Sequence, residues 1–397
     1  MSFEQSWRWF GPKDVITLQE IKQTGATGIV SALHQIPIGE IWTVDKILER
    51  KKIIEDAGFN WTVVESVPVH EEIKKRKGKF QIYINNYKET IRNLAKCKID
   101  TVCYNFMPIL DWSRTNLKVN TNDGAITTKF ESVAMAAFDL FILKRINADK
   151  DYTEIQIRNA HQYFNEMNEQ DKDDLLSTVL FGLPGSLEAY SLDEFRLALS
   201  EYDDIGDSEL RSNLYYFISE IIPIAEEYGI SMVIHPDDPP WPLLGLPRVV
   251  GNKKDIQQIL NVLDSPSNGI TFCTGSFGAG YNNHLVDMAK TFSHRINFLH
   301  LRNVTRDVNN NFMEANHLEG EIDLYEIMKI LLIEQQHRIN IGRKDIRMPM
   351  RPDHGLLMSS EQNKKNIYPG YSLMGRMRAL AELRGMELAI NRSLELN

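Results

Sequence analysis

The 397-residue sequence contains few cysteines, and the three present are Cys97, Cys103 and Cys273. They form neither a CxxC pair nor an even set that could build a disulfide framework, so we expect reduced thiols. The N-terminus lacks a basic segment followed by an apolar one, which argues against a signal peptide. No window approaches 18 uncharged apolar residues, which excludes a membrane span. These absences predict a soluble, cytoplasmic protein.

The sequence also lacks an excess of positive charge. Its formal net charge is −9 and its pI is near 5.7, whereas nucleic-acid binding normally needs a clustered basic surface. The one basic run, residues 74–79, is interpreted as a solvated loop and helix start. The glycine-rich run 275–280 lacks the Lys-Ser/Thr of a phosphate loop and is out of register with G-x-G-x-x-G. We interpret it as a flexible turn between a strand and a helix, and expect no nucleic-acid partner.

An alternation of strand and helix signals is present along most of the chain. Helical periodicity covers 17–25, 43–57, 80–96, 209–228 and 372–394. Strand-like apolar runs occupy 7–10, 28–33, 60–67, 101–107, 231–235, 270–273, 296–300 and 346–353. Eight strands in this order favour a (β/α)₈ TIM barrel over an open doubly wound sheet. The length fits one such barrel enlarged by insertions, or two modest domains; we predict a single TIM-barrel domain over 1–397.

The alternation is interrupted between about 109 and 206. This segment is rich in charged residues and helix formers, so we predict a mostly helical insertion after the fourth strand. A separate domain is the alternative, but the strand–helix pattern resumes directly afterwards. A lid or an oligomer contact are two roles that the insertion could have, and we expect a homo-oligomer, a dimer or larger.

Four residues that can bind metals stand at the C-terminal tips of the last four predicted strands: His235, Cys273, His300 and Asp353. Each residue alone would more often be structural. In a parallel barrel, however, the strand tips converge on one face, where such enzymes carry their chemistry. The four therefore predict a shared metal site. Two imidazoles and a thiolate suggest zinc, whereas a carboxylate with open positions suits Mn²⁺ or Fe²⁺, and the residues leave this choice open.

Several neighbouring groups could act on a substrate. His354 adjoins a proposed ligand and Tyr368 lies in a nearby loop, so both are predicted acid–base groups. Arg302, two residues beyond His300, should point the same way and could clamp a substrate carboxylate. Further predicted substrate contacts are Asn105, Arg114 and Arg8, with Glu65 and His70 as weaker candidates.

Five segments resemble the mannonate dehydratase family. They are Trp7-Arg-Trp-Phe-Gly11, Cys103-Tyr-Asn-Phe-Met-Pro108, Leu110-Asp-Trp-Ser-Arg-Thr115, Val233-Ile-His-Pro-Asp-Asp-Pro-Pro240 and Met350-Arg-Pro-Asp-His-Gly355. The resemblance covers nearly the whole chain and implies a metal-dependent lyase on a xylose-isomerase-like TIM barrel. Such an enzyme converts D-mannonate to 2-dehydro-3-deoxy-D-gluconate and water in hexuronate (glucuronate) breakdown.

The resemblance also implies roles for particular residues. The family's metal ligands correspond to His235, Cys273, His300 and Asp353, with Mn²⁺ or Fe²⁺ preferred, and its acid–base residues to His354 and Tyr368. Two other functions remain open: a metal-dependent sugar isomerase or epimerase on the same barrel, and a non-catalytic protein that binds sugar acids. Isomerases of this kind often use several carboxylate ligands, and acid–base groups beside the ligands argue against a mere binder.

Overall fold

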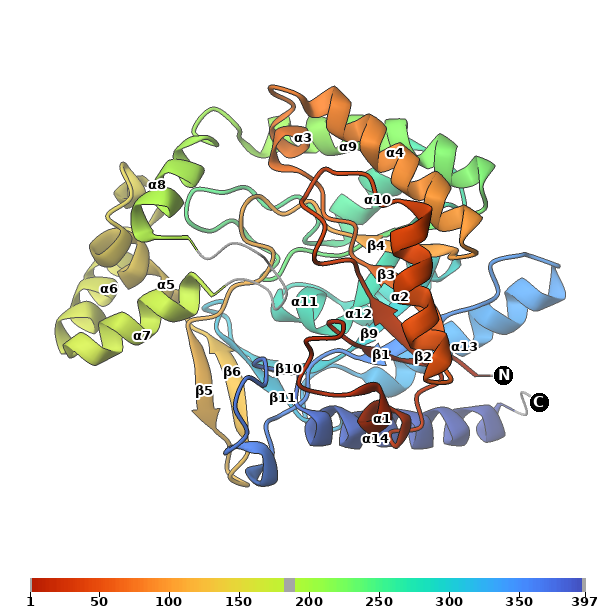
Figure 1. Cartoon of the computed structure of the whole chain (residues 1–397). Helices are drawn as coiled ribbons and strands as arrows, with labels where there is room; N and C mark the ends of the chain where they lie inside the picture. Colours follow the sequence, from red (N-terminus) through yellow and green to blue (C-terminus); the bar gives the residue numbers. More distant parts are fainter. Residues whose placement is uncertain (1, 182–189, 395–397) are drawn as a thin grey trace.

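A closed barrel of eight parallel strands forms the centre of the molecule (Figure 1). The computed structural model describes residues 2–181 and 190–394. The strands follow one another around the barrel in the order β1-β12-β9-β8-β7-β4-β3-β2. Their bounds are β1 (Glu4–Arg8), β2 (Gly28–Ser31), β3 (Asn60–Glu65), β4 (Thr101–Tyr104), β7 (Ser231–Ile234), β8 (Asn268–Cys273), β9 (Ile296–Leu301) and β12 (Pro349–Pro352). The predicted (β/α)₈ barrel is confirmed, and each predicted strand segment overlaps one of these strands.

Helices surround the barrel, and several begin where the sequence provides a cap. Thr17 accepts a hydrogen bond from the backbone N–H of Glu20, whose side chain bonds back, which completes a capping box. Ser372 caps the last helix by accepting a hydrogen bond from the backbone N–H of Gly375. The helices of the barrel region are α1 (Leu18–Lys22), α2 (Val44–Asp56), α3 (Glu71–Lys75), α4 (Phe80–Lys96), α9 (Asp207–Glu227), α10 (Lys253–Val262), α11 (Thr274–Ala279), α12 (Leu285–Phe292), η3 (Ser293–Arg295), α13 (Leu324–Asn340), η4 (Ser359–Glu361) and α14 (Leu373–Ser393).

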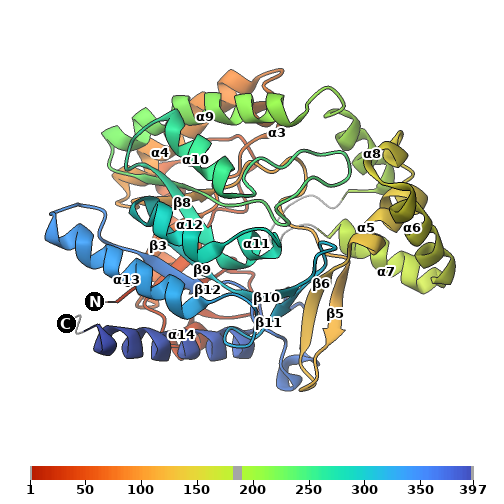
Figure 2. The same cartoon turned by 180° about the vertical axis from the view of Figure 1, so that it is seen from behind.

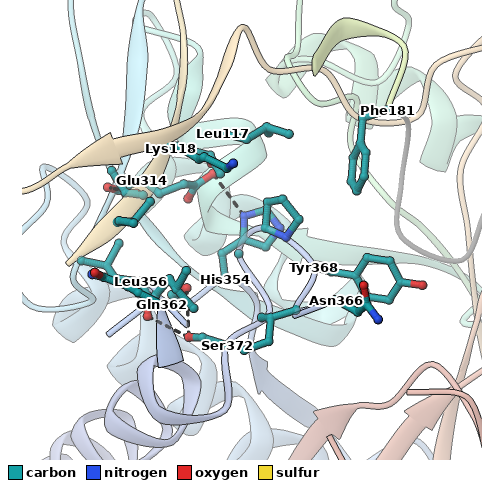
Figure 3. Close-up of a pocket in the computed structure, with 18 of the residues that line it drawn as sticks. Leu117, Lys118, Phe181, Glu314, His354, Leu356, Gln362, Asn366, Tyr368 and Ser372 are labelled. Carbon is teal, nitrogen blue, oxygen red and sulfur yellow. Dashed lines mark hydrogen bonds and ion pairs between the residues drawn. The ribbon is translucent and has the colours of Figure 1, made fainter. Parts of the chain in front are cut away.

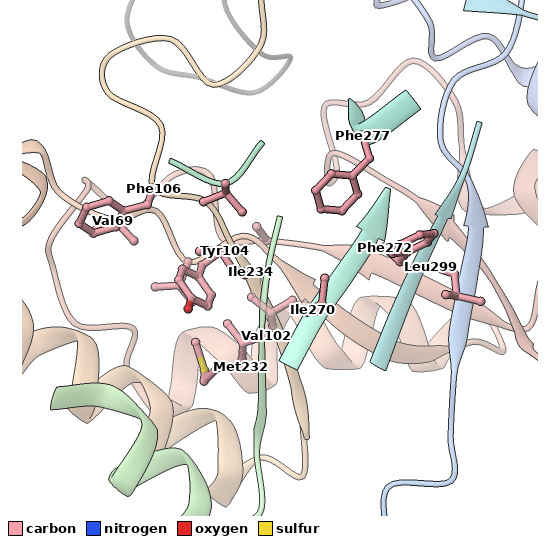
Figure 4. Packing of buried hydrophobic residues seen from close by; sticks show 14 of the residues in the cluster. Val69, Val102, Tyr104, Phe106, Met232, Ile234, Ile270, Phe272, Phe277 and Leu299 are labelled. Carbon is pink, nitrogen blue, oxygen red and sulfur yellow. The ribbon is translucent and has the colours of Figure 1, made fainter. Parts of the chain in front are cut away.

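Two layers of buried side chains follow from the two faces of the strands. Because successive residues of a strand point to opposite faces, one set packs outward against the helices, as Val102, Ile234 and Leu299 do in Figure 4. The alternate set fills the inside of the barrel and is smaller: Val30, Val63, Cys103, Val233 and Phe298. Strands buried on both faces explain why the barrel segments read as continuous apolar runs.

The segment between β4 and α9 projects to one side of the barrel, left in Figure 1 and right in Figure 2. Its described residues from Ser132 onward are mostly helical, as predicted, but the segment opens with a β-hairpin that was not predicted. Strand β5 alternates between half-buried and exposed residues and carries two asparagines and a lysine, so its apolar signal is weak. The elements are β5 (Asn116–Asn120), β6 (Ile126–Phe130), α5 (Ser132–Ala137), η1 (Phe138–Leu143), η2 (Ala148–Asp151), α6 (Glu154–Glu166), α7 (Glu169–Val179) and α8 (Leu192–Ser200).

A second hairpin, β10 (Asn303–Arg306) and β11 (Phe312–Ala315), follows barrel strand β9 and was also not predicted. It pairs with the first hairpin in a four-stranded antiparallel sheet ordered β10-β11-β6-β5. Phe130 of β6 stacks on Phe312 of β11, with ring centroids 5.6 Å apart. This sheet joins two loops that lie far apart in sequence, and it stands at the C-terminal end of the barrel. Among the described residues, no helix combines the length and apolarity that a membrane crossing requires.

Candidate metal centre and active site

The inward-facing residues of the strands continue directly into the site. His235 lies two positions after the interior residue Val233, and His300 lies two positions after Phe298. Cys273 is paired in register with His300 on the neighbouring strand, and so is Arg351 on the other side. Paired residues of parallel strands point to the same face, so all of these side chains enter the barrel mouth. The inward and outward alternation of side chains along each strand therefore brings these residues together in the barrel mouth.

Three of the four predicted ligands form a cluster. The ligand atoms of His235, Cys273 and His300 all lie within 4.8 Å of one another. Asp353 is beside two of them, with Oδ2 3.6 Å from Cys273 Sγ and Oδ1 3.9 Å from His300 Nδ1. Its carboxylate is also held by Arg351, 2.7 Å from Oδ1. The structure thus brings together the N, N and S donors, with the carboxylate at their edge.

The hydrogen bonds of the cluster fit a divalent metal ion. His235 Nδ1 lies 2.7 Å from the carbonyl oxygen of Pro236, so this nitrogen carries the proton and Nε2 carries a lone pair. That Nε2 lies 3.1 Å from His300 Nδ1. Metal–nitrogen bonds of about 2.1 Å at right angles place two ligands about 3 Å apart. Ser276 Oγ lies 3.1 Å from Cys273 Sγ and 3.1 Å from Asp238 Oδ2. The donor set therefore suits one shared cation.

Buried charges surround the cluster. Burial alone would raise the pKa of Asp353, but the Arg351 guanidinium, together with other cationic neighbours, holds that pKa well below its usual range. Burial likewise opposes ionisation of Glu314, yet Arg302 and His354 lower its pKa to about 2. Both carboxylates are therefore ionised at neutral pH.

Two arginines that we predicted as substrate contacts are bound to carboxylates of the protein. Arg302 lies 2.8 Å from Asp238, 3.2 Å from Glu314 and 3.1 Å from Asp353. It borders the cavity of the site, but its charge is shared among these partners. Arg114 is fully buried and bridges Asp238 and Glu314 at 2.7 Å each. Arg114 does not line the small cavity beside the cluster, and its contact with substrate stays a prediction.

Sequence reasoning missed the two carboxylates of this network. Asp238 stands three residues after His235 in the proline-rich segment, where only His235 was predicted to belong to the site. Glu314 lies on β11, in the hairpin that was not predicted. The closeness of Asp238 to His235 in the sequence could have identified Asp238. No local pattern could have identified Glu314, because Glu314 reaches the site only through the pairing of the two hairpins.

A small cavity of about 60 Å³ adjoins this cluster of predicted ligands and is lined in part by His235 and Asp353. Arg8 lines it, and the Nη1 atom of this arginine is buried without a hydrogen-bond partner among the described residues. An unpaired guanidinium nitrogen is suited to an anion such as a carboxylate. Asn105 and Tyr371 line the same cavity, and so does His354. The position of Tyr371 was not foreseen, since nothing in a loop sequence gives the direction of its side chains.

A larger pocket of about 770 Å³ lies outside this cavity, between the β5–β6 hairpin and the loop after β12 (Figure 3). His354 lines both spaces, and its Nδ1 is 3.2 Å from Glu314 Oε1. Tyr368 lines only the outer pocket of the two, with its ring edge against Phe10 at 5.1 Å between centroids. The two predicted acid–base residues therefore border a common pocket. His70, a weaker candidate, instead caps α3 by accepting the N–H of Glu72.

The glycine-rich segment after Cys273 is a buried helix, α11, and the predicted flexible turn is wrong. A Cβ atom on Gly275 would lie 1.7 Å from Arg302 Nε. The missing side chain is what allows Arg302 to cross the helix and reach its carboxylates.

We expect Gly275→Ala to displace Arg302 and to lower the free energy of unfolding by about 1–3 kcal/mol, the usual cost of overpacking. Gly385→Ala in α14 is the matched control, because no atom lies within 4 Å of the added methyl group. Because alanine has a higher helix propensity than glycine, the free energy of unfolding of Gly385→Ala should equal or exceed that of the wild type. Urea denaturation of both variants measures the difference; equal stabilities would contradict the packing argument.

Known proteins similar to this chain match it over nearly its whole length. The family described as D-mannonate dehydratase (UxuA) matches residues 3–396. A curated mannonate dehydratase from Marinomonas sp. (strain MWYL1) is 50% identical over 394 residues, 98% of this chain and 100% of that protein. The crystal structure of mannonate dehydratase from Streptococcus suis serotype 2 has a TM-score of 0.77 at 34% identity, covering 99% of this chain and 95% of that chain. A xylose isomerase-like TIM barrel protein from Mycobacterium smegmatis shares the fold, with a TM-score of 0.51 at 11% identity over 98% of this chain and 97% of that chain.

Proposed function

The chain belongs to the D-mannonate dehydratase family and has the activity of a mannonate dehydratase, a hydro-lyase, and we propose that the reaction takes place at the metal centre described above. D-Mannonate loses water to give 2-dehydro-3-deoxy-D-gluconate. The C2 proton must leave from a carbon beside a carboxylate, and the C3 hydroxyl must depart. The C2 proton is weakly acidic because its removal places further charge next to the carboxylate.

His235, Cys273, His300 and Asp353 are the proposed ligands of Mn²⁺ or Fe²⁺. The observation that carries this proposal is the pair of imidazole nitrogens, His235 Nε2 and His300 Nδ1, 3.1 Å apart beside a buried cysteine. When bound, the ion would supply Lewis-acid stabilisation of the charge that develops on the substrate oxygens. The protein holds the ligands in place through Pro236 O, Ser276 and Arg351.

His354 and Tyr368 are the proposed acid and base. Glu314 accepts the Nδ1 proton of His354, which leaves Nε2 as the nitrogen that can exchange a proton with substrate. One of the two residues takes the proton from C2, and the other gives a proton to the departing C3 hydroxyl so that it leaves as water. The resulting enol then tautomerises to the keto acid.

Substrate recognition is proposed for Arg8 and Asn105. The buried and unpaired Nη1 of Arg8 suits one oxygen of the sugar-acid carboxylate, and Asn105 can hydrogen-bond to a hydroxyl group. Arg302 is proposed to orient Asp353 at the substrate, because its Nη1 donates to Asp353 Oδ2 at 3.1 Å.

The cellular setting is also a proposal. We infer that the enzyme works in hexuronate (glucuronate) catabolism, where its substrate arises, and that it is cytoplasmic because its three cysteines are free. One buried apolar cluster runs from the barrel into the helices of the insertion, which supports folding as one domain. A homo-oligomer is proposed as well, and sedimentation of the purified protein would test it.

Removal of divalent metal is expected to abolish turnover. We expect protein treated with a chelator to form no 2-keto-3-deoxy acid from D-mannonate, because the Lewis-acid stabilisation of the charge that builds up on the substrate oxygens is then lost. Mn²⁺ or Fe²⁺ added back should restore activity, with Mg²⁺ as the comparison ion. Full turnover by metal-free protein would overturn the proposal, and a product with the formula of the substrate would indicate isomerisation instead.

A further inference from the structure

Glu65 lies at the inward-facing tip of β3 and reaches His300 from the side opposite His235. Its Oε2 is 3.3 Å from His300 Nε2. Both of its carboxylate oxygens also contact Arg351, Oε1 at 2.8 Å from Nη2 and Oε2 at 3.1 Å from Nε. Arg351 in turn contacts Asp353 Oδ1 at 2.7 Å. One ion pair, formed by the partly buried Glu65 and the buried Arg351, therefore contacts two of the proposed metal ligands.

His300 can hold its single proton in two ways, and the choice matters for a metal ion. With the proton on Nδ1, His300 donates to His235 Nε2 and accepts from Arg351 Nε at 3.1 Å. With the proton on Nε2, it donates to Glu65 Oε2 and its Nδ1 lone pair faces His235 Nε2. Two facing lone pairs repel each other unless a cation lies between them. The second arrangement is therefore the one that a metal ion requires.

We propose that Glu65 is a positioning residue for the metal: it accepts the Nε2 proton of His300 and thereby directs the Nδ1 lone pair toward the ion. The inference rests on the ligand set of the proposed function. It adds to those ligands a carboxylate that hydrogen-bonds to the non-ligating nitrogen of a histidine. Such a hydrogen bond fixes the tautomer and orientation of a metal-binding imidazole. Arg351 keeps Glu65 in place and at the same time orients Asp353.

Glu65 is a positioning residue in this arrangement and does not itself bind the ion. Its Oε2 contacts His300 Nε2, whereas the other ring nitrogen, Nδ1, is the one that faces His235 Nε2. The imidazole ring therefore stands between Glu65 and the proposed position of the ion. Replacing it should therefore weaken the binding of the metal without changing which atoms bind it.

The test compares metal affinities of the whole protein. We expect Glu65→Gln to bind Mn²⁺ about 10–100-fold more weakly than the wild type, the usual effect of losing such a partner, as measured by calorimetry or by the EPR signal of free Mn²⁺. Glu387→Gln is the matched control: Glu387 is buried and accepts the backbone N–H of Phe3, but it lies at the opposite end of the barrel. Its affinity for Mn²⁺ should be that of the wild type.

A second readout separates positioning from ligation and from misfolding. Saturating Co²⁺ should give Glu65→Gln the same thiolate charge-transfer band as the wild type, because Cys273 remains bound. A changed band at saturation would make Glu65 a ligand and overturn the inference, and wild-type affinity for Mn²⁺ in Glu65→Gln would overturn it as well. Cys273→Ser tests the proposed function separately, since unchanged Mn²⁺ affinity and an unchanged Co²⁺ spectrum in this variant would show that the ligand set itself is wrong.

Discussion

Replacing His354 with glutamine is expected to lower kcat for D-mannonate by about 10²–10⁴-fold, the contribution of one acid–base group. His354 borders both the inner cavity and the outer pocket, and Glu314 fixes its ring by accepting the Nδ1 proton. Glutamine can preserve a hydrogen bond to Glu314 but cannot exchange a proton near neutral pH. The rate of 2-keto-3-deoxy acid formation measures the loss. The metal content should stay that of the wild type, because His354 is not a proposed ligand.

His317→Gln is the control for that substitution. His317 is equally buried, and its Nε2 lies 2.8 Å from the carbonyl oxygen of Leu301, yet it lines neither the cavity nor the outer pocket. We expect its kcat to remain within a few-fold of the wild type. If His354→Gln lost no more activity than His317→Gln, the acid–base role of His354 would have to be given up. A loss of bound metal in His354→Gln would point instead to a damaged metal centre.

The barrel, and the convergence of His235, Cys273 and His300 in its mouth, were predictable because both depend on local patterns. An apolar run that ends in His235 or Cys273 identifies a strand and its tip, and a parallel barrel places all such tips on one face. The period of two along each strand then turns His300 inward two positions after Phe298. Neither step requires knowledge of which distant segments touch.

The rest of the site depends on contacts between distant segments, which a single sequence does not encode in any local pattern. Glu314 reaches His354 because the hairpin β10–β11 pairs with β6, and both hairpins are short with weak strand signals. Arg114 had the right chemistry for substrate but is sequestered by Asp238 and Glu314. Tyr368 and Tyr371 are three residues apart in a loop without periodicity, so nothing local distinguishes which one faces the cavity.

Replacing Arg302 with methionine is expected to lower the free energy of unfolding by about 3–5 kcal/mol, the usual cost of removing one partner of a buried ion pair. Asp238, Glu314 and Asp353 all contact its guanidinium. Methionine retains much of the apolar volume but leaves three carboxylates to share Arg114 and Arg351. Urea unfolding in the presence of a chelator measures this loss without a contribution from bound metal.

The pH dependence of the Arg302→Met loss distinguishes electrostatics from packing. Without Arg302, burial should raise the pKa of at least one of the three carboxyls in the folded state above its unfolded value. The folded variant then holds more protons than the unfolded chain, so its stability falls as pH rises. The loss relative to the wild type should therefore be smaller near about pH 5 than near about pH 7.5. Arg378→Met, which removes solvent-accessible pairs with Glu319 and Glu382, should cost at most about 1 kcal/mol at either pH. A large loss from Arg302→Met that did not change with pH would assign the effect to packing and leave Arg302 without its electrostatic role.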